Sequence, residues 1–134
     1  MPGIELLQFD TLIIGSGLAG LTLAIKLAEH QKVGLITKKS LLDGASGAAQ
    51  GGIAAVLSAD DTQDAHIQDT LTAGAGLCDE AVTRYVIEHG KAAIDWLIAQ
   101  GVPFTRDVSS DTGYHLTREG GHSARRIIHA KDAT

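Results

Sequence analysis

The hydrophobic pattern at the amino end of the chain predicts a strand, a glycine turn and a helix in direct succession. The apolar run Leu12–Ile14 stops at the sequence GSGLAG, and from Leu18 to Glu29 apolar residues recur at helical spacing. A second buried strand is predicted over Lys32–Thr37. This order predicts a right-handed parallel crossover, which is the core of a doubly wound α/β fold.

The later pattern predicts two more helices followed by short strands. A polar turn at Asp60–Asp64 precedes a predicted helix over Ala65–Ala73, and Asp79 is a suitable N-cap for a longer helix over Glu80–Gln100. We expect Gly90 to split or bend that longer helix, at a cost of about 1 kcal/mol relative to alanine. The three predicted strands are Phe104–Arg106, Tyr114–Thr117 and Arg125–His129.

The glycine spacing of the first turn is typical of a dinucleotide site. Gly15 permits the sharp exit from the strand, Gly17 lets the backbone approach a pyrophosphate, and Gly20 lets the helix pack close to the strand. Amide groups at the start of the helix then face the phosphates, and the helix dipole adds to the attraction.

A second glycine-rich segment spans Ser40–Val56. Its interleaved Ala, Ile and Val residues are unusual in a flexible linker, so the glycines favour close approach of the backbone to a flat ligand. Just before it, Lys38 and Lys39 stand where a nicotinamide-binding domain usually has an acid. These lysines are either a solvated loop or cations near an adenosine phosphate or ribose.

Composition narrows the class of partner. The chain has 134 residues, enough for one domain, a net charge of −5, 4% aromatic residues and 16 glycines. The negative charge argues against nucleic acid or an anionic membrane as the main partner. We expect a cytoplasmic protein without a signal peptide or membrane span. Because Ala130–Thr134 resembles the approach to a helix, we also expect the chain to be a fragment.

Histidines and charges accumulate near the carboxyl end. The stretch Arg118–Arg126 is either an exposed loop or a place where backbone and carboxylate meet a polar substrate. Together with Glu119, the residues His115, His122 and His129 match no known ligand pattern, so no metal site is expected. His66 is expected to be hydrogen-bonded to a neighbouring carboxylate or carbonyl.

Five stretches in order carry a resemblance to a known family: LIIGSGLAGL at 12–21, AQGGIAAV at 49–56, HIQDTLTAGAGLCD at 66–79, HLTREGGHS at 115–123 and RRIIHAKDAT at 125–134. From about Asp10 onward the chain resembles the amino-terminal part of the L-aspartate oxidases. These belong to the flavoprotein family that also holds the flavin subunits of succinate dehydrogenase and fumarate reductase.

The resemblance implies that residues 1–134 are the first part of a Rossmann-like FAD-binding domain with a parallel sheet, incomplete because the capping and carboxyl-terminal helical domains are absent. The implied cofactor-binding residues are Gly15, Ser16, Gly17, Leu18, Ala19, Gly20, Lys38, Ala45, Ser46, Gly47, Ala48, Ala49, Gln50, Gly51 and Gly52. Ala45 stands where the succinate dehydrogenase branch has a histidine that carries a covalent flavin. The resemblance therefore implies noncovalent FAD.

The implied reaction is oxidation of L-aspartate to iminoaspartate, with oxygen or fumarate reoxidising the flavin. Glu119 lies in TREGGH, where the succinate branch has a neutral amide, and a carboxylate there would attract the substrate ammonium group. Iminoaspartate feeds quinolinate and NAD synthesis, so quinolinate synthase is an implied partner. A fragment of this length is expected to lack turnover and to expose apolar faces that favour self-association.

Three alternatives remain open from the residues. The first is a succinate- or fumarate-type flavoprotein. The second is a pyridine-nucleotide dehydrogenase in which Lys38 and Lys39 meet the 2′-phosphate of NADP, although that leaves the segment from Ala45 to Val56 without a purpose. The third is an assembly module without chemistry.

Overall fold

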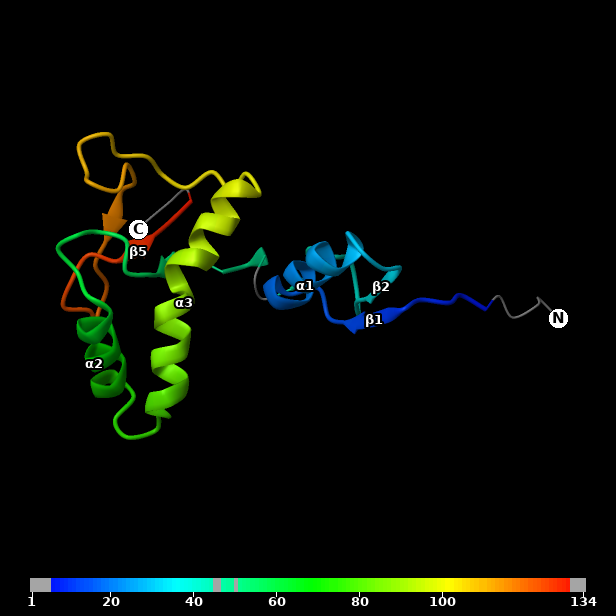
Figure 1. Cartoon of the computed structure of the whole chain (residues 1–134), viewed down its shortest axis with the longest axis horizontal. Coiled ribbons are helices and arrows are strands. Elements are labelled where there is room, and N and C mark those ends of the chain that lie inside the picture. Colours follow the sequence, from blue (N-terminus) through cyan, green and yellow to red (C-terminus); the bar gives the residue numbers. More distant parts are fainter. Residues whose placement is uncertain (1–5, 45–46, 50, 131–134) are drawn as a thin grey trace. The chain divides into compact units, whose positions relative to one another are not determined.

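The computed structural model describes residues 6–44, 47–49 and 51–130. The chain divides into two compact units, Met1–Ala49 and Gln50–Thr134. Figure 1 labels the main helices and strands of both units, and each unit is described by itself below. Among the helices that the structure describes, none is long and apolar enough to cross a membrane.

The first unit is a strand, a helix and a second strand, as the hydrophobic pattern predicted. Strand β1 (Thr11–Ile14) is followed by helix α1 (Leu18–Ala28) and strand β2 (Val33–Ile36). The strands pair in parallel, in a register that runs from Thr11 opposite Val33 to Ile14 opposite Ile36. This parallel pair confirms the predicted α/β class.

Many apolar residues of this unit are exposed to solvent. All eleven residues of α1, each of them described, are at least partly exposed. On the strands, Ile13 is buried, whereas Ile14 is 83% and Ile36 51% exposed. A parallel sheet is normally covered on both faces, so two strands and one helix form only part of such a structure.

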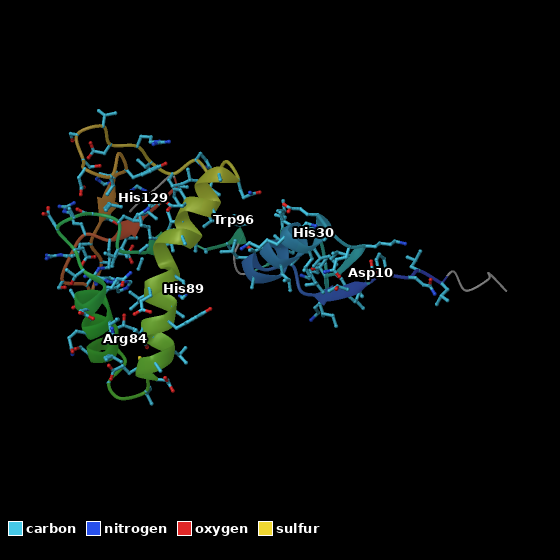
Figure 2. The ribbon with its side chains drawn as sticks, in the orientation of Figure 1. Asp10, His30, Arg84, His89, Trp96 and His129 are labelled. Atoms are coloured by element: carbon cyan, nitrogen blue, oxygen red, sulfur yellow. The ribbon has the colours of Figure 1, made fainter. Side chains whose placement is uncertain are left out.

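The second unit contains two helices that pack against each other (Figure 1). Helix α2 (Gln63–Ala73) is capped by Thr62, whose Oγ1 accepts from the amide of Ala65 at 3.1 Å. Helix α3 (Glu80–Ala99) is capped by Asp79. Arg84 of α3 reaches the carboxylate of Asp64 on α2 at 3.1 Å, and Figure 2 labels it beside α2. Both helices confirm the predicted segments to within two residues.

A small antiparallel sheet completes this unit. Its order is β3-β5-β4, with β3 at Ile53–Ala54, β4 at Leu116–Thr117 and β5 at Ile127–Ile128. The central strand β5 is fully buried, and its Ile128 packs in a core with Ala55, Ile94, Phe104 and Leu116. The sheet therefore joins the last part of the second glycine-rich segment to residues 116–117 and 127–128.

The structure corrects the predicted split of the long helix and one of the predicted strands. Gly90 does not split α3, which is continuous over 20 residues because its buried residues Ile87 and Ile94 hold it against the rest of the unit. The predicted strand Phe104–Arg106 is reduced to a single bridge between Arg106 and Tyr114. Backbone bonds of Thr105 to His129 and His115 take the place of a regular ladder.

Candidate functional site

The first glycine turn joins β1 to α1 with the geometry that its spacing predicted. Gly15 has a φ of +114°, a region that side-chain-bearing residues rarely adopt. A Cβ on Gly20 would collide with the carbonyl oxygen of Gly15. Glycine at these two positions therefore allows the chain to leave the strand sharply and the helix to lie directly against the turn.

The start of α1 lies at the carboxyl edge of the parallel strands, where α/β folds bind ligands. Gly17 is the N-cap, with extended backbone and no side chain to cap the helix. Ser16 is buried, and its hydroxyl lies 3.0 Å from that of Thr37 at the end of β2. Leu18 and Ala19 open the helix and are exposed, and Lys38 follows Thr37 on an exposed bend.

The second glycine-rich segment begins beside this turn. A Cβ on Gly44 would lie 4.0 Å from the carbonyl oxygen of Ser16, and Gly47 donates its amide to Gly44 at 3.0 Å. Gly47, Ala48 and Ala49 are exposed residues of the first unit. The predicted site residues Ala45, Ser46 and Gln50 lie outside the described residues.

The second unit brings Gly51 next to Glu119, although nearly 70 positions separate them in the sequence. A Cβ on Gly51, which has a φ of +97°, would lie 3.6 Å from Oε1 of Glu119. A Cβ on Gly52 would collide with the carbonyl oxygen of Ile128, so the glycine lets the backbone lie flat on β5. Glu119 is exposed and follows β4 by two residues.

A buried ion-pair cluster lies on the same unit and was not predicted. Arg126 has an exposed fraction of 0%. Its Nε and Nη2 each donate to one oxygen of Asp61 at 2.7 Å, and its Nη1 donates to Oδ2 of Asp69 at 2.6 Å. The interpretation of Arg118–Arg126 as an exposed loop is therefore wrong for Arg126, because two distant carboxylates make its burial possible.

The pKa values of Asp69, Arg126 and His66 are shifted by hydrogen bonds, charges and burial in and around this cluster. Hydrogen bonds from the backbone and then the hydroxyl of Ser123, with a further one from Arg126, lower the pKa of Asp69 to about 2. Burial lowers the pKa of Arg126, but hydrogen bonds to Asp61 and Asp69 outweigh it and raise that pKa overall. Burial, followed by the charge of Arg126, lowers the pKa of His66. The hydrogen bonds of the cluster therefore favour the ionised carboxylate of Asp69 and the charged guanidinium of Arg126.

The histidines form two separate contacts. Nδ1 of His115 lies 2.9 Å from Nε2 of His129, which Figure 2 labels in the second unit, while the ring centroid of His122 lies 5.6 Å from that of His66. His66 departs from the expected hydrogen bonding, because its buried Nδ1 has no partner in the described part of the chain.

Within residues 6–44, 47–49 and 51–130, no group of three or more His, Cys, Asp or Glu could hold a metal ion.

The sequence profile of the family described as "FAD binding domain" matches residues 10–134. The chain belongs to this FAD binding domain family. Membership confirms FAD as the cofactor. It leaves no support for the NADP alternative, in which Lys38 and Lys39 would meet a 2′-phosphate.

Curated relatives within this family are L-aspartate oxidases. The chain is 63% identical to L-aspartate oxidase 1 of Ralstonia nicotianae over 128 residues, which are 96% of this chain and 24% of that relative. Identity to the L-aspartate oxidase of Pseudomonas aeruginosa is 56% over 132 residues, and to that of Vibrio cholerae 54% over 130 residues; each covers 95% of this chain and 24% of the relative. The chain thus spans about a quarter of the length of the relatives it matches.

Solved structures agree on the fold. The chain is similar to the FrdA chain of the quinol fumarate reductase of E. coli, with a TM-score of 0.86 and 32% identity over 95% of this chain and 22% of that one. The Sdh1 complex of Mycobacterium smegmatis gives a TM-score of 0.83 and 25% identity, over 91% of this chain and 21% of that one. These likenesses confirm the predicted resemblance to the succinate dehydrogenase and fumarate reductase flavoproteins.

Removing one carboxylate from the buried cluster is expected to destabilise the second unit. Asp61→Asn leaves the guanidinium of Arg126 without its bidentate partner, and breaking a buried pair of this kind costs about 3–5 kcal/mol. Urea unfolding followed by fluorescence of Trp96, the single tryptophan, measures this unit. The control Asp60→Asn, at an exposed neighbour, should stay within about 0.5 kcal/mol of the parent chain. Equal effects of the two changes would contradict the assignment.

Acid should weaken the cluster in a defined range of pH. Because the pKa of Asp69 falls from 3.8 to about 2 on folding, its ionised form stabilises the fold above pH ~4, and this contribution is lost as the pH falls toward 2. The amide proton of Ser123, bonded to this carboxylate, provides an NMR reporter. Its chemical shift should titrate with a midpoint near pH 2. A midpoint close to 3.8 would show that the carboxylate is free in solution.

Proposed function

We propose that this chain is the amino-terminal part of the FAD-binding domain of an L-aspartate oxidase. The reaction is FAD-dependent oxidation of L-aspartate to iminoaspartate, with oxygen or fumarate as the acceptor. The observation that carries the proposal is the place of Glu119 beside Gly51, in a chain 63% identical to an L-aspartate oxidase. The rest of the family's domain, the capping domain and the helical domain would follow residue 134.

The cofactor-binding residues of the proposal are those at the two glycine-rich segments. Amides at the start of α1 would bind the pyrophosphate, and Lys38 at the end of β2 would lie near the adenosine end. The full set is Gly15, Ser16, Gly17, Leu18, Ala19, Gly20, Lys38, Ala45, Ser46, Gly47, Ala48, Ala49, Gln50, Gly51 and Gly52. The close approach of Gly44 to Ser16 supports a common role for the two segments.

Glu119 is the substrate-recognition residue of the proposal. L-Aspartate differs from succinate by an ammonium group, and an exposed carboxylate beside a bare glycine backbone suits that group. A charge-assisted hydrogen bond of this type is worth about 1.5–3 kcal/mol. A carboxylate at the same place repels a dicarboxylate that lacks the ammonium. This favours L-aspartate over the succinate-type alternative, in agreement with the names of the relatives.

The bound flavin supplies the electron acceptor, and this chain supplies binding and orientation. We propose that the flavin is held noncovalently, because alanine at position 45 has no nucleophilic atom to bond it. Quinolinate synthase is the proposed consumer of the product, and the cytoplasm the proposed location. The 134 residues alone should have no turnover, and the exposed apolar residues of the first unit favour self-association of the isolated chain.

FAD added to the purified chain should remain with it through gel filtration and should be released on denaturation. Retention tests the proposed site, since the chain carries both glycine-rich segments. Release of all flavin into the filtrate after unfolding tests the noncovalent assignment. Gly20→Ala should abolish retention, because its Cβ collides with the Gly15 carbonyl, whereas Gly120→Ala meets open space and should retain flavin. The proposal would be contradicted if flavin stayed with the unfolded chain, or if the folded chain retained NADPH instead of FAD.

Glu119→Gln should weaken recognition of L-aspartate. The host is a chimera in which this chain replaces the matching segment of the Ralstonia nicotianae enzyme. Loss of the ammonium contact should lower kcat/KM for L-aspartate by about 10–150-fold, mainly through KM, since the contact already exists in the bound substrate. The control Glu29→Gln changes an exposed acid at the end of α1 and should leave both parameters unchanged. An unchanged KM in Glu119→Gln removes this residue from its proposed role.

A further inference from the structure

We propose that Asp69, on helix α2, is a positioning residue that sets the place of the Glu119 carboxylate. This inference rests on the proposed function of Glu119 as the residue that recognises the substrate ammonium. Asp69 makes no contact with the proposed cofactor segments in the hydrogen bonds and ion pairs of the described residues. Its role is to fix the loop that carries Glu119.

The loop in question joins β4, which ends at Thr117, to β5, which begins at Ile127 (Figure 1). Its first half is a turn in which the amide of His122 donates to the carbonyl oxygen of Glu119 at 3.3 Å. Gly121 brings this turn close to α2, since a Cβ there would lie 3.7 Å from that of Ala73. The backbone position of Glu119 therefore depends on where residues 121–123 are held.

Asp69 holds that part of the loop through a single oxygen. Its Oδ2 accepts from the amide of Ser123 at 2.7 Å and from the hydroxyl of Ser123 at 2.7 Å. The same oxygen accepts from Nη1 of Arg126 at 2.6 Å. Three donors on one ionised acceptor form a strong anchor, because charge-assisted hydrogen bonds are shorter and stronger than neutral ones.

The far end of the loop is fixed by Arg126. Its guanidinium is bound twice to Asp61, just before α2, and its amide donates to the carbonyl oxygen of Thr117 at 3.1 Å. Nη1 of Arg126 also lies 3.3 Å from Nδ1 of His122. Asp69 is thus the link between this buried anchor and the turn that begins at Glu119.

Loss of Asp69 would remove the single oxygen that accepts from both the amide and the hydroxyl of Ser123, while the backbone bond from Arg126 to Thr117 at the base of the loop would remain. Binding sites require their contacting groups to be held within a fraction of an ångström by supporting residues. We therefore expect Asp69→Ala to weaken the interaction of Glu119 with the substrate without touching the substrate itself.

The test is a double-mutant cycle in the Ralstonia nicotianae chimera, with Asp69→Ala, Glu119→Gln and the pair combined. Asp69→Ala alone should raise KM for L-aspartate about 10-fold and change kcat by less than about 3-fold. In the Glu119→Gln background the same change should have little further effect, because the interaction it supports is already gone. Asp64→Asn, an exposed acid on the same helix, is the matched control and should leave KM unchanged.

Two further measurements distinguish general misfolding of the Asp69→Ala variant from loss of the proposed positioning role. Flavin absorbance must be retained, and hydrogen exchange over residues 118–125 should rise in Asp69→Ala by a larger factor than exchange in α3. If Asp69→Ala does not fold, Asp69→Asn retains an acceptor for Ser123 and should give a smaller rise in KM that is again absent with Glu119→Gln.

The outcomes separate the two proposals. If Glu119→Gln raises KM and the effects of the two substitutions multiply, Asp69 acts independently of Glu119 and the positioning role is overturned while the proposed function stands. If Glu119→Gln leaves KM unchanged, the ammonium role itself is overturned, and the positioning role with it. Unchanged exchange over residues 118–125 in Asp69→Ala overturns the anchor whatever the kinetics.

Discussion

The second unit depends on one guanidinium that has no access to solvent. A buried charge is tolerated only when it is paired and fully hydrogen-bonded, and Arg126 meets this condition through Asp61 and Asp69. These acids lie 65 and 57 positions away in the sequence. Their pairing ties the segment just before α2 and the middle of α2 to the residue that precedes β5, at the end of the β4–β5 loop.

The position of the candidate substrate group follows from this tie. Glu119 is exposed and has no ion-pair partner among the contacts of the described residues, so its own side chain does not fix it. Its loop is held by neighbours that are buried or ionised. For the proposed role of Glu119 such anchoring matters, because a carboxylate on an unanchored loop would lose binding free energy to the entropy of ordering that loop.

The first unit depends on a different constraint, which is the close approach of the backbone at Gly15 to the backbone at Gly20. Gly15 and Gly20 allow helix and strand to meet without side chains between them, and the helix start is then available at the carboxyl edge of the strands. Much of the apolar surface of this unit is open. The first part of the proposed FAD site is therefore formed by residues close together in the sequence, whereas the region around Glu119 is built from distant segments.

The sequence alone determined the elements and the cofactor family. Period and capping predicted α1, α2 and α3, and the glycine spacing predicted the dinucleotide turn, because these features depend on residues close together in the chain. The tertiary structure decided what no local pattern contains: Arg126 is buried rather than exposed, Gly90 leaves α3 continuous, and Glu119 lies beside Gly51. Each of these depends on long-range packing, since the free energy of a charge or a glycine is set by the groups that the fold places around it.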